Sequence, residues 1–317
     1  MQKSNLILLT GSSNQKLAAD IGLKLNLDVF YPIDRFADGE IRISIPRNIR
    51  RNDVFIIQPT APDVNSSIME LLLMIDAAKR SSASEITAII PYFSYSRQDR
   101  KDRPRVPISS SLLAQIIRTA GADRIVTVDI HSEQQQGFFS GPWDNLYGSY
   151  SLVPTLRKMK IKDLVIASPD KGGVSKATAY ARFLNAEGIA IVFKERDVTV
   201  VNKSETLDMI GDVKGKNVLI VDDIIDTAGT LANATKLLLD RGAKTVRAAA
   251  THGLFSEPAL ERIEKSGILE VFVTDTVVAS KEVLKHPKIK IISVAKLVAE
   301  AIRRIETGES ISEGLIL

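Results

Sequence analysis

The chain has 317 residues, of which 44% are hydrophobic and 25% charged, a composition typical of a soluble globular protein long enough for two domains. It contains no cysteine, which excludes disulfides, thiolate metal sites and cysteine nucleophiles. The net charge of +4 favours small phosphorylated ligands over nucleic acid, and no apolar run reaches the roughly 18 residues that span a bilayer, so we expect a cytoplasmic protein with no nucleic-acid or membrane partner.

The first half of the chain predicts alternating strands and helices of an α/β fold. Apolar, β-branched runs indicate strands, and apolar residues at helical spacing indicate helices. Strands are expected over 5–10, 28–31, 41–45, 53–59, 86–91 and 124–131, and helices over 15–25, 64–79 and 109–120.

Two polar segments of this half are candidate sites. Asp34 to Glu40 contains Asp38-Gly39, which by itself predicts a hairpin turn. The second segment, Tyr92 to Arg105, has five basic residues between Arg97 and Arg105. Arginine pairs bidentately with phosphates, so a polyphosphate or RNA could bind there, although a solvated charged loop neutralised by its own aspartates is the simpler alternative.

The expected strand over 124–131 carries Asp129 and His131 to its carboxyl end. A lone histidine is more often structural than a ligand. Its position at a strand end beside an acid nevertheless favours contact with a metal or a phosphate.

In the second half, a strand over 165–168 leads into Asp170-Lys-Gly-Gly173. The glycines permit close approach to a diphosphate and Asp170 offers an oxygen to Mg²⁺, but a plain turn fits the spacing equally well. A strand over 190–193 then runs into Lys194 and Arg196, which head a polar segment through Asp208. The two cations suggest a lid over a reacting phosphate, with a solvated loop as the alternative.

The most informative segment is Asn217 to Thr230, a strand over 218–221 followed by a polar loop and a helix over 231–240. Asp222 and Asp223 are placed to accept hydrogen bonds from sugar hydroxyls, and the small residues after them favour a phosphate at the helix start. A capped helix with solvated acids is the alternative. Residues 221–230 resemble the phosphoribosyl diphosphate-binding motif of the phosphoribosyltransferase family, which implies that family's α/β fold.

An internal similarity predicts two copies of one α/β unit. Residues 121–131 can be laid over 242–252, with Gly and His ten positions apart in both, and residues 8–13 over 165–173. In this alignment the basic loop takes the place of the sugar-phosphate loop. One copy would then hold a nucleotide polyphosphate and the other a sugar phosphate.

Taken together, these motifs resemble the ribose-phosphate diphosphokinase family over nearly the whole chain. The resemblance rests on residues 36–40, 96–103, 129–131, 136–139, 144–147, 168–173, 194–196 and 222–230. It implies two tandem phosphoribosyltransferase-type domains, 1–147 with the returning segment 302–317, and 148–301. It also implies transfer of the β,γ-diphosphoryl group of ATP to the C1 hydroxyl of ribose 5-phosphate, giving phosphoribosyl diphosphate and AMP.

The resemblance implies a role for each matching position. Lys194 and Arg196 would be catalytic, and His131 and Asp170 would organise Mg²⁺. ATP would be bound by Phe36, Asp38, Glu40, Arg97, Gln98 and His131. Ribose 5-phosphate would be bound by Asp222, Asp223, Asp226, Thr227, Ala228, Gly229 and Thr230. The diphosphate would be bound by Asp170, Lys171, Gly172 and Gly173.

The resemblance further implies a homo-oligomer, usually a hexamer, activated by inorganic phosphate and inhibited by ADP, in which residues 36–40 hold adenine across a subunit boundary. Two departures stand out: Ala37 occupies a position where the family commonly has serine or asparagine, and residues 197–204 are less basic than in many relatives. The alternatives are a catalytically silent subunit of the same fold, a phosphoribosyltransferase, and an RNA-binding protein built on the basic loop.

Overall fold

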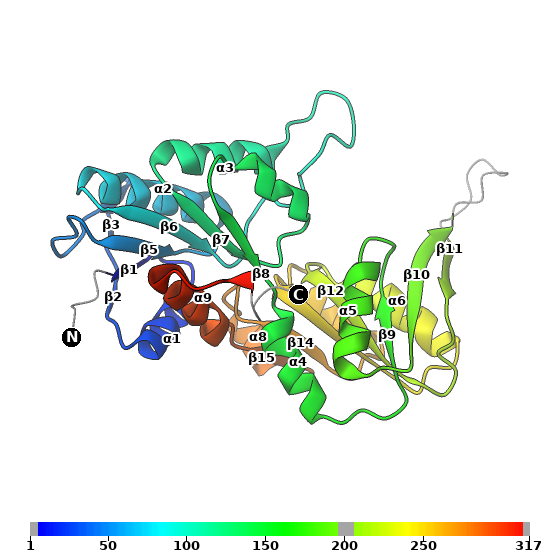
Figure 1. Cartoon of the computed structure of the whole chain (residues 1–317). Coiled ribbons are helices and arrows are strands. Elements are labelled where there is room, and N and C mark those ends of the chain that lie inside the picture. Colours follow the sequence, from blue (N-terminus) through cyan, green and yellow to red (C-terminus); the bar gives the residue numbers. More distant parts are fainter. Residues whose placement is uncertain (1–5, 196–205, 313–317) are drawn as a thin grey trace. The chain divides into compact units, whose positions relative to one another are not determined.

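The computed structural model describes residues 6–195 and 206–312, which fall into two compact units (Figure 1). Unit 1 comprises Met1–Gly148, Thr276–Val278 and Ser293–Leu317, and unit 2 comprises Ser149–Asp275 and Ala279–Ile292. Arg196, one of the two expected catalytic residues, lies outside the described residues.

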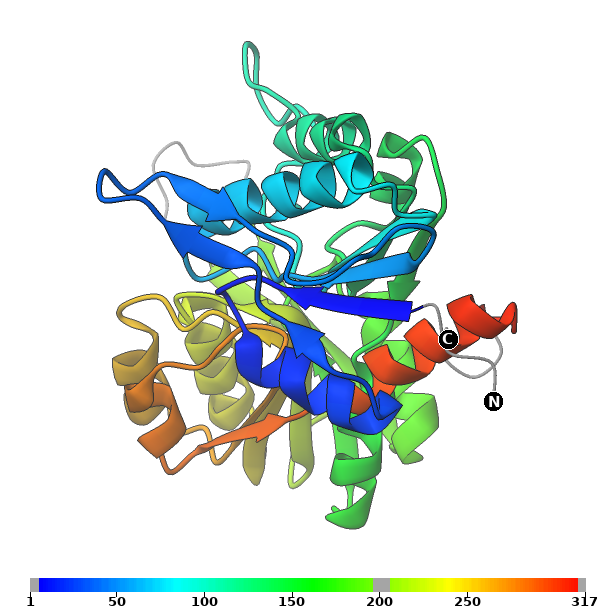
Figure 2. The same cartoon turned by 90° about the vertical axis from the view of Figure 1, so that its left-hand side faces the viewer.

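Unit 1 is a three-layer α/β sandwich. Its six strands are all parallel, in the order β2-β1-β5-β6-β7-β8. Helices α2 and α3 lie on one face of the sheet, and α1 and α9 on the other (Figure 2). The elements are β1 (Leu6–Thr10), α1 (Gln15–Leu25), β2 (Val29–Phe30), β5 (Asp53–Ile57), α2 (Val64–Arg80), β6 (Glu85–Ile90), α3 (Ser109–Ala120), β7 (Arg124–Val128), β8 (Trp143–Leu146) and α9 (Ala295–Thr307).

A separate two-stranded hairpin follows β2 in unit 1. Strands β3 (Ile33–Arg35) and β4 (Ile41–Ile43) pair antiparallel, and Gly39 in the turn between them has a φ of 94°. The prediction of a hairpin turn at Asp38-Gly39 is therefore confirmed. A 3₁₀ helix, η1 (Glu133–Phe138), precedes β8.

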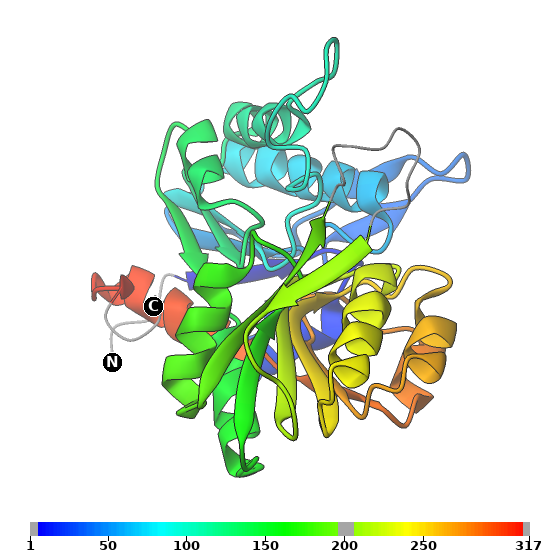
Figure 3. The ribbon, with the colours of Figure 1, turned by 90° about the vertical axis from the view of Figure 1, so that its right-hand side faces the viewer.

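Unit 2 is a second three-layer sandwich, with the strand order β11-β10-β9-β12-β13-β14-β15. Only the edge strand β11 is antiparallel to its neighbour. Helices α4 and α5 cover one face and α6 and α7 the other (Figure 3). The elements are α4 (Ser149–Lys158), β9 (Leu164–Ser168), α5 (Val174–Leu184), β10 (Gly188–Glu195), β11 (Thr206–Ile210), β12 (Asn217–Ile225), α6 (Gly229–Asp240), β13 (Thr245–Gly253), α7 (Ala259–Lys265), β14 (Val271–Thr274), α8 (Lys281–Lys285) and β15 (Ile289–Ile292).

The apolar run in β12 is continuous because both faces of a parallel sheet are covered. Val218 and Ile220 belong to the core cluster that includes Leu231 and Leu238 of α6. Leu219 and Val221 belong to the opposite cluster, which includes residues of α4 and α5. The strand thus ties both layers of unit 2 to the loop that follows it.

The two units share one topology. Read from β2 and from β10, the sheets β2-β1-β5-β6-β7-β8 and β10-β9-β12-β13-β14-β15 have the same connectivity. The prediction of two copies of one α/β unit is therefore confirmed, but part of the proposed alignment is wrong. It placed 121–131 (β7) over 242–252 (β13), whereas β13 corresponds to β6.

The alignment failed because helix, glycine and strand recur with similar spacing several times in each unit. Gly121 and Gly242 both end helices with positive φ, 126° and 90°, which made two non-equivalent junctions look alike. The counterpart of the sugar-phosphate loop after β12 is therefore the loop after β5, and the basic loop after β6 corresponds to the loop after β13.

Other expected elements also need correction. The strand expected over 124–131 ends at Val128, because Asp129 takes a left-handed conformation with φ 45°. The polar segment expected through Asp208 contains strand β11 from Thr206. Within residues 6–195 and 206–312, no helix has both the length and the hydropathy needed to cross a membrane.

Candidate functional site

The acidic pair of unit 2 lies on strand β12 itself, beyond its apolar run. Asp222 and Asp223 are half-buried, and the backbone N–H of Asp223 donates to Asp222 Oδ1 at 2.8 Å. Burial, followed by the neighbouring Asp223 carboxyl, raises the pKa of Asp222 well above its usual value. A carboxyl held in this way is a strong acceptor for a hydroxyl ligand that replaces the water it has lost.

Lys176 in the first turns of α5 acts on the same carboxyl. Its positive charge opposes the rise in the pKa of Asp222, although it is the smallest of the contributions. The acidic pair is thus electrostatically linked to the helix that follows the expected diphosphate loop.

The turn after β12 forms the start of helix α6. Asp226 and Thr227 lead to Ala228, which has a left-handed φ of 55°, and the helix begins at Gly229. Thr227 and Thr230 are exposed. The first N–H groups of a helix have no intrahelical acceptor and carry the positive end of its dipole, so this turn can receive a phosphate.

Arg262 of α7 supports this turn from outside. Its Nη1 donates to the carbonyl oxygen of Thr227 at 2.9 Å, and a Cβ at Gly229 would lie 3.2 Å from the same nitrogen. The guanidinium therefore holds the peptide group between Thr227 and Ala228, the residue with the left-handed φ.

The expected diphosphate loop is held by its own side chains. Gly173 N donates to Asp170 Oδ1 at 2.9 Å, and Ser168 Oγ donates to the carbonyl oxygen of Asp170 at 2.6 Å. A Cβ at Gly173 would lie 2.6 Å from Ser168 Oγ, so any larger residue would displace that side chain and its hydrogen bond to Asp170. Lys171 lies over the ring of Phe193, 5.4 Å from its centroid.

No metal cage is formed by protein side chains in the described part of the chain. Across residues 6–195 and 206–312, no three or more His, Asp or Glu side chains gather closely enough to hold an ion. His131 and Asp170, the expected metal residues, belong to different units. Their role therefore stays a prediction, and it requires phosphates and water to complete the coordination of an ion.

Lys194 lies near the end of β10, where it pairs with Leu207 of the antiparallel strand β11. The expected lid thus begins as a two-stranded extension at the edge of the sheet.

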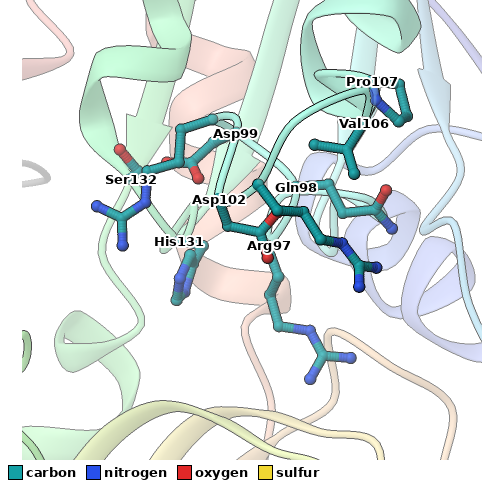
Figure 4. Close-up of a pocket in the computed structure, with 10 residues that line it drawn as sticks. Arg97, Gln98, Asp99, Asp102, Val106, Pro107, His131 and Ser132 are labelled. Carbon is teal, nitrogen blue, oxygen red and sulfur yellow. The ribbon is translucent and has the colours of Figure 1, made fainter.

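In unit 1, the basic loop and His131 line one hollow of about 630 Å³ (Figure 4). The guanidinium of Arg97 and the imidazole of His131 both extend toward the lower part of that view, from different segments of the chain. Three of the six expected ATP-binding residues, Arg97, Gln98 and His131, therefore lie together. The hollow is lined by Arg97, Gln98, Asp99, Arg100, Asp102, Arg103, Val106, Pro107, His131 and Ser132.

The beginning of the basic loop is held by two hydrogen bonds. Gln135 Nε2 donates to the carbonyl oxygen of Ser96 at 2.9 Å. Gln98 Oε1 accepts from Ser109 Oγ at 2.7 Å, at the start of α3. These two bonds place Arg97 at a defined position, whereas residues 100–105 are exposed.

The bend that carries His131 is set by two buried side chains. Asp129 Oδ2 accepts from Gly148 N at 2.9 Å, and Asn145 Oδ1 accepts from Ile130 N at 2.9 Å. Asp129 is only 7% exposed, so it shapes the bend instead of pointing into the hollow. His131 itself is exposed.

The remaining three expected ATP-binding residues lie on the turn of the β3–β4 hairpin. Phe36, Asp38 and Glu40 are exposed and are not part of the hollow around His131. Asp38 Oδ1 accepts from Glu40 N at 3.1 Å, and the guanidinium of Arg42 lies 5.2 Å from the centroid of the Phe36 ring. The turn therefore presents an aromatic face and two carboxylates to solvent.

Two residues that act on the end of β12 were not predicted from the sequence. Lys176 and Arg262 belong to elements distant from it in the chain. The position of Lys176, shortly after the diphosphate glycines, offered a signal, whereas the contact of Arg262 depends on tertiary packing that no local pattern reports. Asn145 lies in the segment 144–147, which the resemblance had already singled out.

Two parallel α/β units of one topology, with polar loops at the carboxyl ends of their strands, define a tandem phosphoribosyltransferase-type protein. Two family models match the chain: the N-terminal domain of ribose phosphate pyrophosphokinase over residues 6–121, and the phosphoribosyl synthetase-associated domain over residues 195–315. The chain belongs to the ribose-phosphate pyrophosphokinase family, as two curated relatives and one solved structure also indicate.

The ribose-phosphate pyrophosphokinase of Wolinella succinogenes is 47% identical over 96% of this chain and 97% of its own length. That of Caldanaerobacter subterraneus subsp. tengcongensis is 47% identical over 98% of each chain. The crystal structure of phosphoribosylpyrophosphate synthetase from Mycobacterium smegmatis is 40% identical, covers 96% of this chain and 99% of its own, and has a TM-score of 0.90.

Proposed function

We propose that this protein transfers the β,γ-diphosphoryl group of ATP to the C1 hydroxyl of ribose 5-phosphate, giving phosphoribosyl diphosphate and AMP. The observation that supports this proposal is that one member of this family has two polar regions of different character. The turn after β12 suits a sugar phosphate, and the hollow around Arg97 and His131 suits a nucleotide polyphosphate.

In unit 2, ribose 5-phosphate binds at the end of β12. Asp222 and Asp223 accept hydrogen bonds from the ribose hydroxyls, and residues 226–230 receive the 5-phosphate at the start of α6. The loop from Asp170 to Gly173 receives the diphosphate as it arrives at C1. These assignments use charge and hydrogen-bond donors of the kinds that each ligand group requires.

In unit 1, ATP binds to Arg97, Gln98 and His131, and its adenine to Phe36, Asp38 and Glu40. The hairpin turn is exposed, which is compatible with its serving a neighbouring copy of the chain. The aromatic ring provides a stacking surface, and the carboxylates accept from the amino group of the base.

The transfer itself needs positioning and positive charge more than covalent help from the protein. Lys194 and Arg196 neutralise the charge that develops on the β-phosphoryl oxygens. The oxygen of the ribose C1 hydroxyl attacks the β-phosphorus, and the hydroxyl proton is lost to solvent. The bond between the β-phosphorus and the oxygen that bridges to the α-phosphate breaks, and AMP leaves with that oxygen. The acidic residues around the sugar keep the hydroxyl oriented toward the phosphorus.

Mg²⁺ is the metal that we assign to this reaction, held mainly by the phosphates of ATP. Oxygen ligands and a preference for retained water fit an ion that carries few protein ligands. His131 and Asp170 would be the protein's contacts to it. When bound, the ion screens the charge of the phosphates.

We further propose a cytoplasmic homo-oligomer, a hexamer, activated by inorganic phosphate and inhibited by ADP. These properties follow from the family resemblance and not from the geometry of a single chain.

The test is the formation of AMP from ATP, followed with and without ribose 5-phosphate and in the absence of any nucleobase. We expect AMP only when ribose 5-phosphate and Mg²⁺ are both present. No AMP, together with intact folding, would favour a silent subunit, and consumption of phosphoribosyl diphosphate with a nucleobase would favour a phosphoribosyltransferase. Repeating the assay at several phosphate concentrations, with analytical ultracentrifugation, tests the effector and the hexamer.

A further inference from the structure

A buried carboxylate in unit 1 takes no part in the proposed chemistry. The side chain of Glu70, on α2, is 0% exposed. It accepts from the backbone N–H of Ser12 at 2.9 Å, from Ser12 Oγ at 2.7 Å and from Gln58 Nε2 at 2.9 Å. Arg35 is a charged partner of this carboxylate, with its Nη2 2.8 Å from Glu70 Oε1.

Arg35 connects this buried carboxylate to the β3–β4 hairpin. It is the last residue of β3 and immediately precedes Phe36. Its Nη2 also donates to Ser66 Oγ of α2 at 3.0 Å, and its Nη1 donates to the carbonyl oxygen of Gly39 in the hairpin turn at 3.4 Å. One guanidinium therefore joins the turn to helix α2.

The turn of the hairpin needs such a connection because only the base of the hairpin is packed. Ile33 belongs to the core of unit 1 and Ile41 and Ile43 pack against that core, whereas residues 34–40 are exposed. Strands β3 and β4 form a separate two-stranded sheet of three residue pairs, outside the six-stranded sheet. Isolated two-stranded hairpins are marginally stable in water. Contact of β4 with α2 and the Arg35 bonds thus determine how the turn is presented.

The topology shared by the two units shows which loop of unit 2 corresponds to the loop that Glu70 contacts in unit 1. The loop from Gly11 to Asn14 after β1 corresponds to the loop after β9 in unit 2, which we assign to a diphosphate. In unit 1, the Ser12 N–H of that loop donates its hydrogen bond to Glu70. An internal carboxylate thus takes a donor that the second unit would offer to a ligand.

We propose that Glu70 and Arg35 are positioning residues, which hold the hairpin so that Phe36, Asp38 and Glu40 receive the base of ATP. The proposal rests on the proposed function. Removing Arg35 leaves Glu70 as a buried charge without its guanidinium partner and releases the hairpin turn, so the effect reaches nucleotide binding through the hairpin. Ribose 5-phosphate, which we place in unit 2, does not depend on this pair.

The experiment compares Arg35→Lys, Arg35→Met and Glu70→Gln with Asp76→Asn. The last is an acid-to-amide change on the same helix, at an exposed pair with Arg80 that is remote from the hairpin bonds. Lysine preserves the charge next to Glu70 but lacks the planar fork that reaches both Glu70 and Gly39, so Arg35→Lys separates stability from positioning. The readouts are Tm, KM for each substrate, kcat, and Kd for ATP by calorimetry.

We expect Arg35→Lys to keep Tm close to that of the parent chain while raising both KM and Kd for ATP at least tenfold. KM for ribose 5-phosphate should stay within twofold, and Asp76→Asn should behave like the parent. Equal rises in KM for both substrates would overturn the inference. Unchanged ATP binding in Arg35→Lys, Arg35→Met and Glu70→Gln would overturn it as well. A parent chain that binds ATP but forms no AMP would instead contradict the proposed function, and the calorimetric comparison would still test the pair.

Discussion

Asp222 is a residue whose charge opposes folding while it serves ligand binding. Its pKa is raised, mainly by burial. The unfolded chain therefore loses this proton at a lower pH than the folded chain, and stability falls as the pH rises above the usual value of 3.8. Hydrogen bonds from bound sugar hydroxyls would offset the free energy that burial of this carboxylate costs.

We therefore predict that Asp222→Asn raises Tm at pH 8 and that the gain shrinks as the pH is lowered toward 5. The amide keeps the shape and the oxygen that accepts from Asp223 N, but it removes the charge. The same variant should raise KM for ribose 5-phosphate about tenfold, because a hydrogen bond to a charged group contributes about 1.5–3 kcal/mol. Thermal scans across this pH range and steady-state kinetics measure both effects. A lower Tm at pH 8 would mean that the charge is well compensated in the folded chain.

Arg262 gives a second prediction at this scale. Arg262→Met removes the donor to the Thr227 carbonyl and should loosen the turn that enters Ala228. We expect KM for ribose 5-phosphate to rise about three- to tenfold, the equivalent of one ordinary hydrogen bond, while KM for ATP changes little. Lys265→Gln, which breaks an exposed ion pair with Glu261 on the same helix, is the matched control. Equal effects of the two variants would show that Arg262 acts only through the stability of α7.

Residues within one local motif could be predicted from the sequence, and residues that support them could not. Asp222 to Thr230 form a contiguous segment, from the end of β12 to the start of α6, whose composition carries its own signal. Arg262 reaches Thr227 from 35 positions away, and Glu70 reaches Ser12 across 58 positions. Both are surrounded by ordinary helical sequence, so nothing near them reports the contact.

At the scale of elements, the catalytic prediction concerns the end of β10. Lys194→Ala should lower kcat on the order of a hundredfold and leave KM for ATP nearly unchanged, because a charge that stabilises the transition state is lost. Lys216→Ala, which breaks a surface pair with Glu187 in the same unit, is the control and should retain full turnover. Rapid-quench measurement of AMP in a single turnover locates the effect in the chemical step. A large loss of ATP binding with normal turnover would contradict the assignment.

Element boundaries were predicted best where a local stop signal exists. Helix α3 spans Ser109–Ala120 as expected, because Gly121 ends it with a φ of 126°. The short strands β3 and β8 were not predicted, since each has two adjacent polar residues and neither contains an apolar run. Strand β11 was missed because its polar residues pair with β10 at the edge of the sheet, where alternate side chains face solvent.

At the scale of the whole chain, each unit contains a helix that follows the last strand of the other. Helix α4 comes directly after β8, the last strand of unit 1, yet it belongs to unit 2, where it packs near α5. Helix α9 comes after β15, the last strand of unit 2, and belongs to unit 1, where it packs against α1. The family resemblance implied a boundary between residues 301 and 302, which lies within α9 (Ala295–Thr307). The periodicity of a helix identifies its apolar face but not the unit that covers it.

The assignment of α9 to unit 1 leads to a prediction opposite to the one that proximity in the sequence would give. Ile302 of α9 is fully buried, so Ile302→Ala should lower the free energy of unfolding by about 2–5 kcal/mol. The loss of amide hydrogen-exchange protection should be concentrated in α1 and β1, at the other end of the chain, because α9 packs against α1. Strand β15, the nearest strand in the chain, should keep its protection. Leu284→Ala on α8 is the control, since that side chain is 65% exposed and its truncation should change stability by less than about 0.5 kcal/mol. Protection lost first in β15 would mean that α9 is energetically part of unit 2, and the exchange of helices would then have no thermodynamic consequence.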